Sequence, residues 1–532
     1  MKSWRLFLMV AIVVLLSLHL LLKNDQQISS QLFSNSYSPY HKRKQLRTRN
    51  GSENFKSIDN NILSRSKDNF KPIDKYTLRG STDRDILARL QDAIPNNNIT
   101  QEMYERAFLW KGNTVKLRKI FREAIVKKTP ISMATIGGSV SAGGGIDQGS
   151  CEFPCLYMEI LAQWMSTVFG IPVESRNTAM GGANSEYFSH CLNAHVSMET
   201  TDIVIGEFAT NDQLSHSQSG FREMGRPLEE LIRNTMKQQR ENRPVLILAD
   251  FVDKKILGPE FNSSHTCSFD LEQKHYKPLL EYYDITGVSL FNMVCPVYGE
   301  QLGFYSSDII SYDYFHPSHL SHHYIAIVLI KFFAGIIKEA LNPLPLGLPN
   351  PYLPTPVLNS TWITNPVCFT NKRHEQIDSY SNLSVTELNG FHKYILRTSL
   401  RRFRKFEVME YRKDLFNGFK GNKQGDWITL DLVAPIRPSG RVQQVLSLGY
   451  VNCEFCNETI ISVWIGMRQK PISPVFNFTT FKYSPGTIII QVDDINLSDY
   501  VKEQQRFNVT IMLNGSYDFI LHAAMIAWRY IK

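Results

Sequence analysis

The sequence predicts a three-layer α/β/α domain built on a parallel sheet, followed by an antiparallel β-sandwich. Between residues 100 and 340, short apolar runs alternate with amphipathic helical segments, which is typical of a parallel sheet with helices on both faces. Beyond residue 360, apolar residues recur at every second position, as in antiparallel strands. With 532 residues, 43% of them hydrophobic, the chain has enough apolar side chains for two cores.

The elements of the first domain follow in order along the chain. The predicted strands are 131–136, 172–177, 201–208, 244–251 and 287–292. The predicted helices are 155–169, 227–242 and 316–341, the last with an apolar stripe at helical spacing.

A linker and a second domain complete the folded part of the chain. Residues 341–360 form the linker, because six prolines between 341 and 356 exclude both a helix and a central strand. Residues 361–532 form the β-sandwich. In its strands Ile428, Leu430 and Leu432 alternate with polar residues, as do Phe507, Val509, Ile511 and Leu513.

The N-terminus predicts membrane insertion. Residues 1–23 contain an apolar run from Leu6 to Leu22 behind Lys2 and Arg5. Its length suits a bilayer-spanning helix, and the charge bias places the N-terminus in the cytosol and the rest in the lumen. A cleaved signal peptide, giving a secreted protein, is the alternative, but no small-x-small cleavage pattern follows directly. Residues 24–95 are polar and predict a disordered stem.

Glycosylation sequons and cysteines agree with a lumenal compartment such as the Golgi. Candidate N-glycosylation sites are Asn50, Asn98, Asn262, Asn359, Asn382, Asn457, Asn477, Asn496, Asn508 and Asn514. The eight cysteines are Cys151, Cys155, Cys191, Cys267, Cys295, Cys368, Cys453 and Cys456. An even number suits disulfides in an oxidising lumen, although the sequence does not determine their pairing. It leaves the oligomeric state open too.

The charge balance does not point to a nucleic-acid partner. The formal net charge of +8 is spread over a long chain, and the basic run at 41–44 lies on no recognisable nucleic-acid module. We interpret the excess as solvated surface.

The stretch 134–145, ATIGGSVSAGGG, ends a predicted strand in a glycine-rich loop. It lacks the lysine of a phosphate loop, the spacing of a dinucleotide fingerprint and the Gly-x-Ser-x-Gly elbow. It does offer Ser139 at a strand end among small neighbours. By itself such a stretch is more typical of a tight strand-to-helix turn.

Three later stretches change that interpretation. NTAMGGANS (177–185), FATND (208–212) and DYFHPS (313–318) follow in order. With IGGSVSAG they resemble the four blocks of the SGNH hydrolase superfamily, also called GDSL-like esterases and lipases, over residues 100–340. The resemblance implies a flavodoxin-like domain in which Ser139 is the nucleophile, Asp313 and His316 complete the triad, and Gly182 and Asn211 form the oxyanion hole with the Ser139 amide.

The chemistry agrees with each of these roles. A serine hydroxyl needs a neighbouring base, for which His316 is suited. Asp313, three residues earlier, can reach the other imidazole nitrogen within one turn. A glycine amide at 182 and the Asn211 side chain supply donors for a developing oxyanion. All of them follow strand ends or precede the last helix, where ligands bind in open parallel sheets.

Two positions depart from the common pattern of the superfamily. Gly138 stands where an aspartate usually precedes the serine, and Ala179 where glycine or serine is common. The resemblance therefore indicates a divergent eukaryotic branch with an Ile-Gly-Gly-Ser block.

Other candidate sites are weaker. His316, His319, His322 and His323 form a cluster, but no acidic partner in a zincin-like pattern accompanies them. Cys453 and Cys456 have redox or half-zinc spacing, yet suit a structural disulfide better. The aromatic residues Trp427, Tyr450, Trp464 and Trp528 could stack on sugars, but in strands such residues are more often core.

We therefore expect a type II membrane glycoprotein whose lumenal serine esterase hydrolyses acyl esters, such as O-acetyl groups on a glycan, without metal or cofactor. A transferase that passes the acyl group to a sugar hydroxyl would use the same triad. A non-catalytic glycan-binding or scaffolding protein, with the sandwich as its functional part, is the alternative from another class.

Overall fold

The computed structural model describes most of the chain beyond residue 82. The described residues are 83–93, 95, 97–146, 154–213, 224–237, 244–251, 267, 269–299, 303–311, 313, 316–342, 353–358, 363–370, 383–404, 407–452, 460–479, 489–515 and 518–530. The predicted membrane anchor at 1–23 and most of the predicted stem lie outside these ranges.

The first domain is built on a six-stranded sheet in the order β1-β6-β5-β4-β2-β3. Its strands are β1 (Phe108–Trp110), β2 (Ile131–Gly137), β3 (Val173–Asn177), β4 (Ile203–Glu207), β5 (Val245–Asp250) and β6 (Thr286–Ser289). The five strands β2 to β6 are parallel, and their order is that of flavodoxin-like folds. Only β1 pairs antiparallel, at the edge beside β6.

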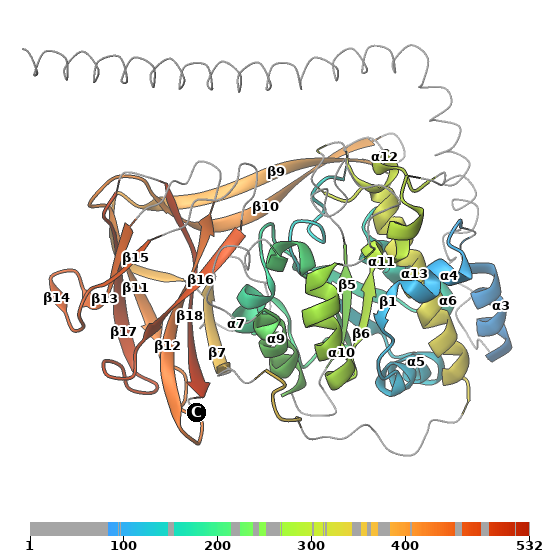
Figure 1. Cartoon of the computed structure of the whole chain (residues 1–532), viewed down its shortest axis with the longest axis horizontal. Helices are drawn as coiled ribbons and strands as arrows, with labels where there is room; N and C mark the ends of the chain where they lie inside the picture. The colour runs from blue at the N-terminus through green and yellow to red at the C-terminus, as the bar shows by residue number, and fades with distance from the viewer. Residues whose placement is uncertain are drawn as a thin grey trace, which may run out of the picture. The chain divides into compact units, whose positions relative to one another are not determined.

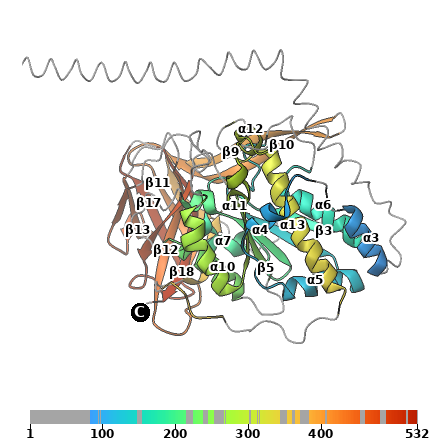
Figure 2. The same cartoon turned by 45° about the vertical axis from the view of Figure 1, so that its right-hand side comes forward.

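Helices cover both faces of this sheet. They are α3 (Asp83–Ala93), α4 (Gln101–Arg106), α5 (Val115–Lys127), α6 (Tyr157–Phe169), α7 (Ser185–His195), α9 (Arg226–Met236), the π-helix η1 (Leu271–Tyr276), α10 (Lys277–Tyr283), α11 (Leu290–Val294), the 3-10 helix η2 (Cys295–Val297), α12 (Ser306–Ile309) and α13 (His319–Ala340). Helices α5, α6 and α13 lie on one face, and α7, α9 and α10 on the other (Figures 1 and 2). The predicted three-layer architecture is confirmed.

The sequence pattern located the strands β2 to β6 and the helices α6, α9 and α13, but it did not predict β1 or the other helices, and two of its predictions were wrong in part. The predicted strand at 287–292 is only half correct, because the chain turns into α11 after Ser289 and the serine hydroxyl caps that helix. The disordered stem predicted up to residue 95 ends earlier. Residues 83–93 form α3, in which Ile86, Leu90 and Ala93 are spaced to share one face and are buried.

Helix α13 is the core helix of the domain. Among the described residues it is the one helix long and apolar enough to cross a membrane, but 78% of its most apolar window is buried in the fold. It packs against α5 and α6, so its apolar sequence is explained by burial within the protein.

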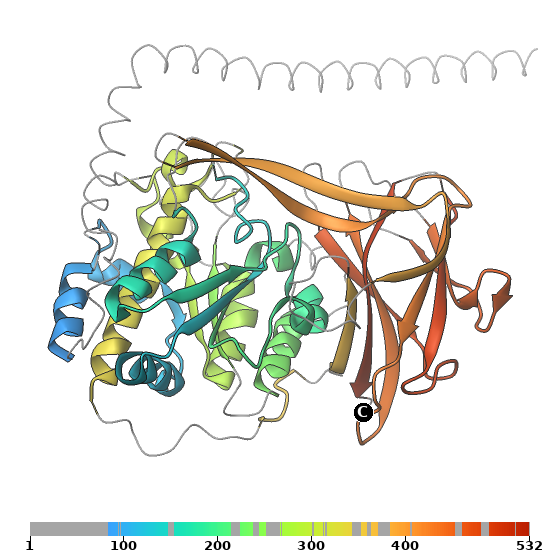
Figure 3. The ribbon, with the colours of Figure 1, turned by 180° about the vertical axis from the view of Figure 1, so that it is seen from behind.

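The second domain consists of two antiparallel sheets. The first contains β7 (Ile363–Thr370), β9 (His392–Arg404), β10 (Glu407–Gly421), β12 (Val442–Asn452), β16 (Ile489–Asn496) and β18 (Phe519–Tyr530). The second contains β8 (Ser384–Asn389), β11 (Trp427–Val433), β13 (Ile460–Met467), β14 (Lys470–Pro471), β15 (Phe476–Thr479) and β17 (Arg506–Leu513). Figure 3 shows these strands in colours that run from dark yellow for β7 to red for β18. The predicted sandwich is confirmed.

The two strands predicted from alternation pair with each other. Ile428 lies opposite Ile511, Leu430 opposite Val509 and Leu432 opposite Phe507 in the β11–β17 ladder. These side chains form a core between the two sheets. Because side chains in a strand alternate between faces, one correct register places the whole apolar set inside.

Burial decides the role of the aromatic residues in the sandwich. Tyr450, Trp464 and Trp528 are buried, as expected for core residues. Trp427 is half-buried, and the Arg468 guanidinium carbon lies 5.2 Å from its ring centroid. The first three rings therefore offer no face to a sugar.

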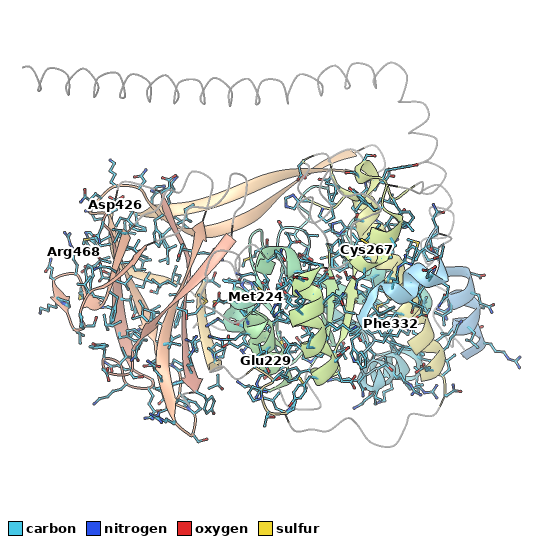
Figure 4. All side chains as sticks on the ribbon, in the orientation of Figure 1. Met224, Glu229, Cys267, Phe332, Asp426 and Arg468 are labelled. Carbon is cyan, nitrogen blue, oxygen red and sulfur yellow. A yellow bond between two sulfur atoms is a disulfide. The ribbon has the colours of Figure 1, made fainter. Side chains whose placement is uncertain are left out.

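The described part of the linker is held against the first domain. The buried Glu229 carboxylate of α9, labelled in Figure 4, accepts hydrogen bonds from the amides of Val357 and Leu358 at 2.6 and 3.0 Å. Arg233, one turn later, donates to the Pro354 carbonyl at 2.6 Å. A disulfide joins Cys191 of α7 to Cys368 of β7, so α7 is covalently linked to the sandwich.

Candidate active site

Ser139 lies in a tight turn directly after β2. The chain leaves the strand at Gly137, and the amides of Ala142 and Gly144 donate to the carbonyls of Gly138 and Ser139 at 3.1 and 2.7 Å. These bonds wind residues 138–144 into a compact turn at the carboxyl end of the sheet. The Ser139 side chain is half-buried, so its hydroxyl is held in place but remains accessible.

His316 meets this serine from a distant part of the chain. Its Nε2 atom lies 2.8 Å from Ser139 Oγ, although 177 residues separate the two in sequence. Its Nδ1 atom lies 2.7 Å from Asp313 Oδ2. With Nδ1 protonated toward the carboxylate, Nε2 is the acceptor for the serine proton.

The Asp313 carboxylate is fixed by three donors from two residues. Oδ1 accepts from the His316 amide at 2.9 Å and from the Ser311 hydroxyl at 2.6 Å, and Oδ2 bonds the imidazole. Burial by itself would raise the pKa of Asp313. The hydrogen bonds and positive charge of His316, with the Ser311 bond, hold that pKa below its usual range. Asp313 is therefore ionised at neutral pH.

The loop that carries Asp313 and His316 is pinned at both ends. Ile310 and Pro317 form an isolated antiparallel bridge, and the Ser311 amide donates to the His316 carbonyl at 2.8 Å. Ser318 then caps α13 by accepting from the Ser321 amide. The imidazole is thus held immediately before the N-terminus of the longest helix in the domain.

The glycine-rich loop makes room for the imidazole. A Cβ atom at Gly144 would lie 2.9 Å from His316 Nε2, and one at Gly145 would lie 2.4 Å from His316 Cβ. Gly145 also has a φ of +75°, in the left-handed region. These two glycines serve the approach of His316 to Ser139.

Gly182 and Asn211 lie close to the same turn. Gly182 has a φ of +75° in the turn before α7, and that turn is tied to β2 by a bond from the Met180 amide to the Gly137 carbonyl. Asn211 lies in the helical turn after β4, and its side-chain Nδ2 donates to the Ala183 carbonyl at 2.7 Å. A Cβ atom at Gly138 would lie 2.0 Å from that nitrogen.

This contact explains why position 138 is a glycine. With an aspartate, or any other side chain, at position 138, the Asn211 amide would have to move. The glycine lets Asn211 Nδ2 approach the backbone beside Ser139. Ala179, the second departure, is completely buried and fits without strain in its turn.

The other sequence candidates do not form a metal site in the described part of the chain. No group of three or more metal-ligating side chains occurs among the described residues. His322 is buried against Tyr157 and Phe251, and burial, with the charges of His319 and His316, lowers its pKa to about 3. Cys453 and Cys456 lie outside the described residues. The described cysteines, Cys155, Cys191, Cys267, Cys295 and Cys368, are all in disulfides, including a Cys267–Cys295 pair.

Sequence reasoning missed four residues of this site: Ser311, Gly144, Gly145 and the buried Glu207 at the end of β4. A signal existed for Glu207, because a carboxyl group within the apolar run IVIGEF is unusual for a buried strand. No comparable signal marks Ser311, whose partner is decided by the loop conformation.

The fold is a flavodoxin-like α/β domain followed by a β-sandwich, and it brings the hydrogen-bonded side chains of Ser139, His316 and Asp313 together. A crystal structure of a two-domain esterase (CEX) active on acetylated mannans has this fold. It aligns with a TM-score of 0.54 and 18% identity over 80% of this chain and 99% of that one. The same esterase co-crystallized with mannopentaose gives a TM-score of 0.52 and 18% identity over 81% and 98%. No protein-family model and no curated protein matches the sequence.

Proposed function

We propose that this protein is a serine esterase that hydrolyses acyl esters on a carbohydrate through an acyl-enzyme on Ser139. The observation that carries the proposal is the continuous chain of hydrogen bonds from Ser139 Oγ through His316 to the Asp313 carboxylate. It joins a nucleophile, a base and an orienting carboxylate at the carboxyl end of a parallel sheet, where such folds bind ligands.

In the first half of the reaction Ser139 Oγ attacks the ester carbonyl carbon as His316 Nε2 takes the hydroxyl proton. Asp313 stabilises the imidazolium that forms. The tetrahedral intermediate then collapses, the bond to the alcohol oxygen breaks, and His316 returns the proton to that oxygen. The alcohol leaves, and the acyl group remains on Ser139.

In the second half a water molecule attacks the acyl carbon while His316 accepts its proton. Collapse of this intermediate releases the carboxylic acid and returns a proton to Ser139 Oγ. In both halves negative charge develops on the former carbonyl oxygen. We assign its stabilisation to the Asn211 side chain and to the Gly182 and Ser139 amides, each such donor contributing about 3 to 4 kcal/mol.

A glycan-linked acetyl or other acyl ester is the substrate class that we propose. Support comes from the similarity in fold, over four fifths of the chain, to an esterase active on acetylated mannans. The two-domain arrangement, an α/β domain with a sandwich behind a linker, is shared over nearly the whole length of that esterase.

We also propose that the enzyme acts in the lumen of the secretory pathway, anchored by residues 1–23 as a type II membrane protein. The disulfides of the described cysteines suit an oxidising compartment. Of the candidate glycosylation sites, Asn98, Asn477 and Asn496 are exposed, and Asn508 and Asn514 are half-buried. Asn50, Asn262, Asn359, Asn382 and Asn457 lie outside the described residues.

The test compares three forms of the chain: wild type, Ser139→Ala, and Ser307→Ala as a matched control, since Ser307 is exposed on α12. On p-nitrophenyl acetate and on acetylated mannan we expect turnover by wild type and control, and none above background by Ser139→Ala. Equal release of acetate by all three would overturn the proposal. Adding an unacetylated oligosaccharide distinguishes transfer from hydrolysis, because a transferase would yield acylated oligosaccharide at the expense of free acetate.

A further inference from the structure

Glu207 is a buried carboxyl group directly beneath the nucleophile turn. It is the last residue of β4, lies opposite Gly137 of β2 in the sheet, and is 0% exposed. Its Oε2 atom accepts the amide hydrogens of Gly138 at 3.2 Å and Ser141 at 3.3 Å, and the Gly138 amide also donates to the Glu207 main-chain carbonyl at 3.3 Å. One carboxyl oxygen thus holds the backbone on both sides of Ser139.

These hydrogen bonds to Glu207 determine the direction of the remaining amides of the turn. The amides of Ala142, Gly143 and Gly144 are used within the turn itself. Among the residues that the structure describes, the Ser139 amide donates to no main-chain carbonyl. Because the amides of Gly138 and Ser141 bond Glu207, the Ser139 amide is available to donate to a substrate oxygen.

Acidic groups surround Glu207. Asp250 at the end of β5 and Asp212 after β4 act on it with negative charge, and it acts in turn on the phenols of Tyr157 and Tyr276. Burial, with the charges of Asp250 and Asp212, raises the pKa of Glu207 to about 8, against the opposing effect of the two amide hydrogen bonds. The carboxyl group therefore carries a proton at neutral pH.

We propose that Glu207 is a positioning residue for catalysis: its carboxyl oxygen clamps the amides of Gly138 and Ser141 and so aims both the hydroxyl and the amide of Ser139. This inference rests on the proposed esterase function. The neutral form is the competent one, because a carboxylate in the same place would repel the negative charge that develops on the substrate oxygen.

Two substitutions separate the effect of the acceptor oxygen from the effect of side-chain volume. Glu207→Gln keeps the size and an acceptor oxygen, so we expect kcat at pH 7 within about threefold of wild type. Glu207→Leu keeps a similar volume without the acceptor, and we expect kcat to fall by roughly 10² with KM changed less than threefold, because only transition-state geometry is lost. Circular dichroism and thermal unfolding confirm that each variant is folded.

The pH profile of kcat tests the protonation state. Wild-type kcat should fall as the pH rises through about 8, and Glu207→Gln should lack this alkaline limb. Asp250→Asn removes a charge that raises the Glu207 pKa, so its alkaline limb should move to lower pH. The phenols of Tyr157 and Tyr276 titrate far above this range, since burial raises their pKa values.

The outcomes are distinguishable. If wild type hydrolyses esters and Glu207→Leu keeps its kcat, or if Glu207→Gln loses kcat as fully as Glu207→Leu, the clamp is wrong while the esterase stands. If wild type hydrolyses no ester and Ser139 is not labelled by a fluorophosphonate probe, the proposed function fails. Hydrogen exchange of the Ser141 amide then still tests the clamp, because that amide bonds only the side chain of Glu207. Exchange should accelerate in Glu207→Leu alone, and equal exchange in all forms would refute it.

Discussion

The His316 imidazole lies between Ser139 Oγ at 2.8 Å and Asp313 Oδ2 at 2.7 Å, and each of its ring nitrogens thereby has one defined partner. In this geometry Nε2 can accept the serine proton, and the Asp313 carboxylate stabilises the imidazolium that forms. The residues around His316 maintain these two contacts.

Asp313→Asn should retain the fold but lower kcat by roughly 10³ to 10⁴, as an amide in this place of a triad favours the wrong imidazole tautomer. Ser311→Ala removes only one of the bonds to Oδ1 and should cost about 1 kcal/mol, or roughly fivefold in kcat. Steady-state kinetics on p-nitrophenyl acetate measure both. A loss in Ser311→Ala as large as in Asp313→Asn would show that the serine does more than orient the carboxylate.

Asn211→Ala should lower kcat by roughly 10² to 10³ with little effect on KM, since an oxyanion donor acts mainly in the transition state. The exposed Asn342→Ala is the matched control. An increase of KM without a change of kcat would instead assign Asn211 to ground-state binding.

Alanine at the site glycines should inactivate the enzyme. At Gly138 the new Cβ would displace Asn211, and at Gly145 it would collide with His316 in a left-handed backbone conformation. Gly335 in α13 provides the control, because a Cβ there meets nothing within 4 Å. Gly335→Ala should raise stability by about 0.5 to 1 kcal/mol. Steady-state kinetics and thermal unfolding of the three variants test these expectations. Full activity of Gly145→Ala would contradict the close approach of Gly145 to His316.

The Cys191–Cys368 disulfide should stabilise the chain more than Cys267–Cys295. The first disulfide joins cysteines that are 177 residues apart in the sequence, and the second joins cysteines that are 28 residues apart. In the chain-entropy description this difference is worth about 1.6 kcal/mol. Paired serine replacements, compared by thermal unfolding, test the order. A larger loss of Tm in the Cys267/Cys295 pair would contradict it.

Stability should decrease as the pH rises from about 6.5 to about 8, because the buried His322 and His323, whose pKa values burial lowers, contribute in the opposite sense only below that range. Burial first, then neighbouring charge, raises the pKa of Glu207 to about 8, and burial raises that of Asp250 to about 7. Between the unfolded and folded pKa values the folded state binds more protons, so each carboxyl group removes about 1.4 kcal/mol per pH unit across its window. Asp313, with its lowered pKa, contributes in the opposite sense only in acid.

Denaturant unfolding at several pH values measures this slope. Glu207→Gln cannot titrate, and it should show a shallower decline than wild type. Equal slopes in the two proteins would mean that Glu207 is ionised in the folded state.

Local pattern was sufficient for the strands β2 to β6 and for three helices of the first domain. Alternation at Ile428, Leu430 and Leu432 predicted β11, and the order of strands and helices predicted the α/β domain. It failed where tertiary contacts decide. After Ser289 an apolar run can continue as strand or helix, and in α3 a short amphipathic segment is ordered by burial of Ile86 and Leu90.

The sequence by itself determined which chemical groups are available: a serine after a strand, an aspartate three residues before a histidine, and an asparagine after another strand. Only the tertiary structure decided that they meet. The approach of His316 to Ser139 depends on Gly144 and Gly145, and the aim of the serine depends on Glu207 beneath it. The physical reason is that hydrogen bonds act over about 3 Å, so contacts between residues far apart in the chain arise only when the sheet brings the ends of its strands to one edge.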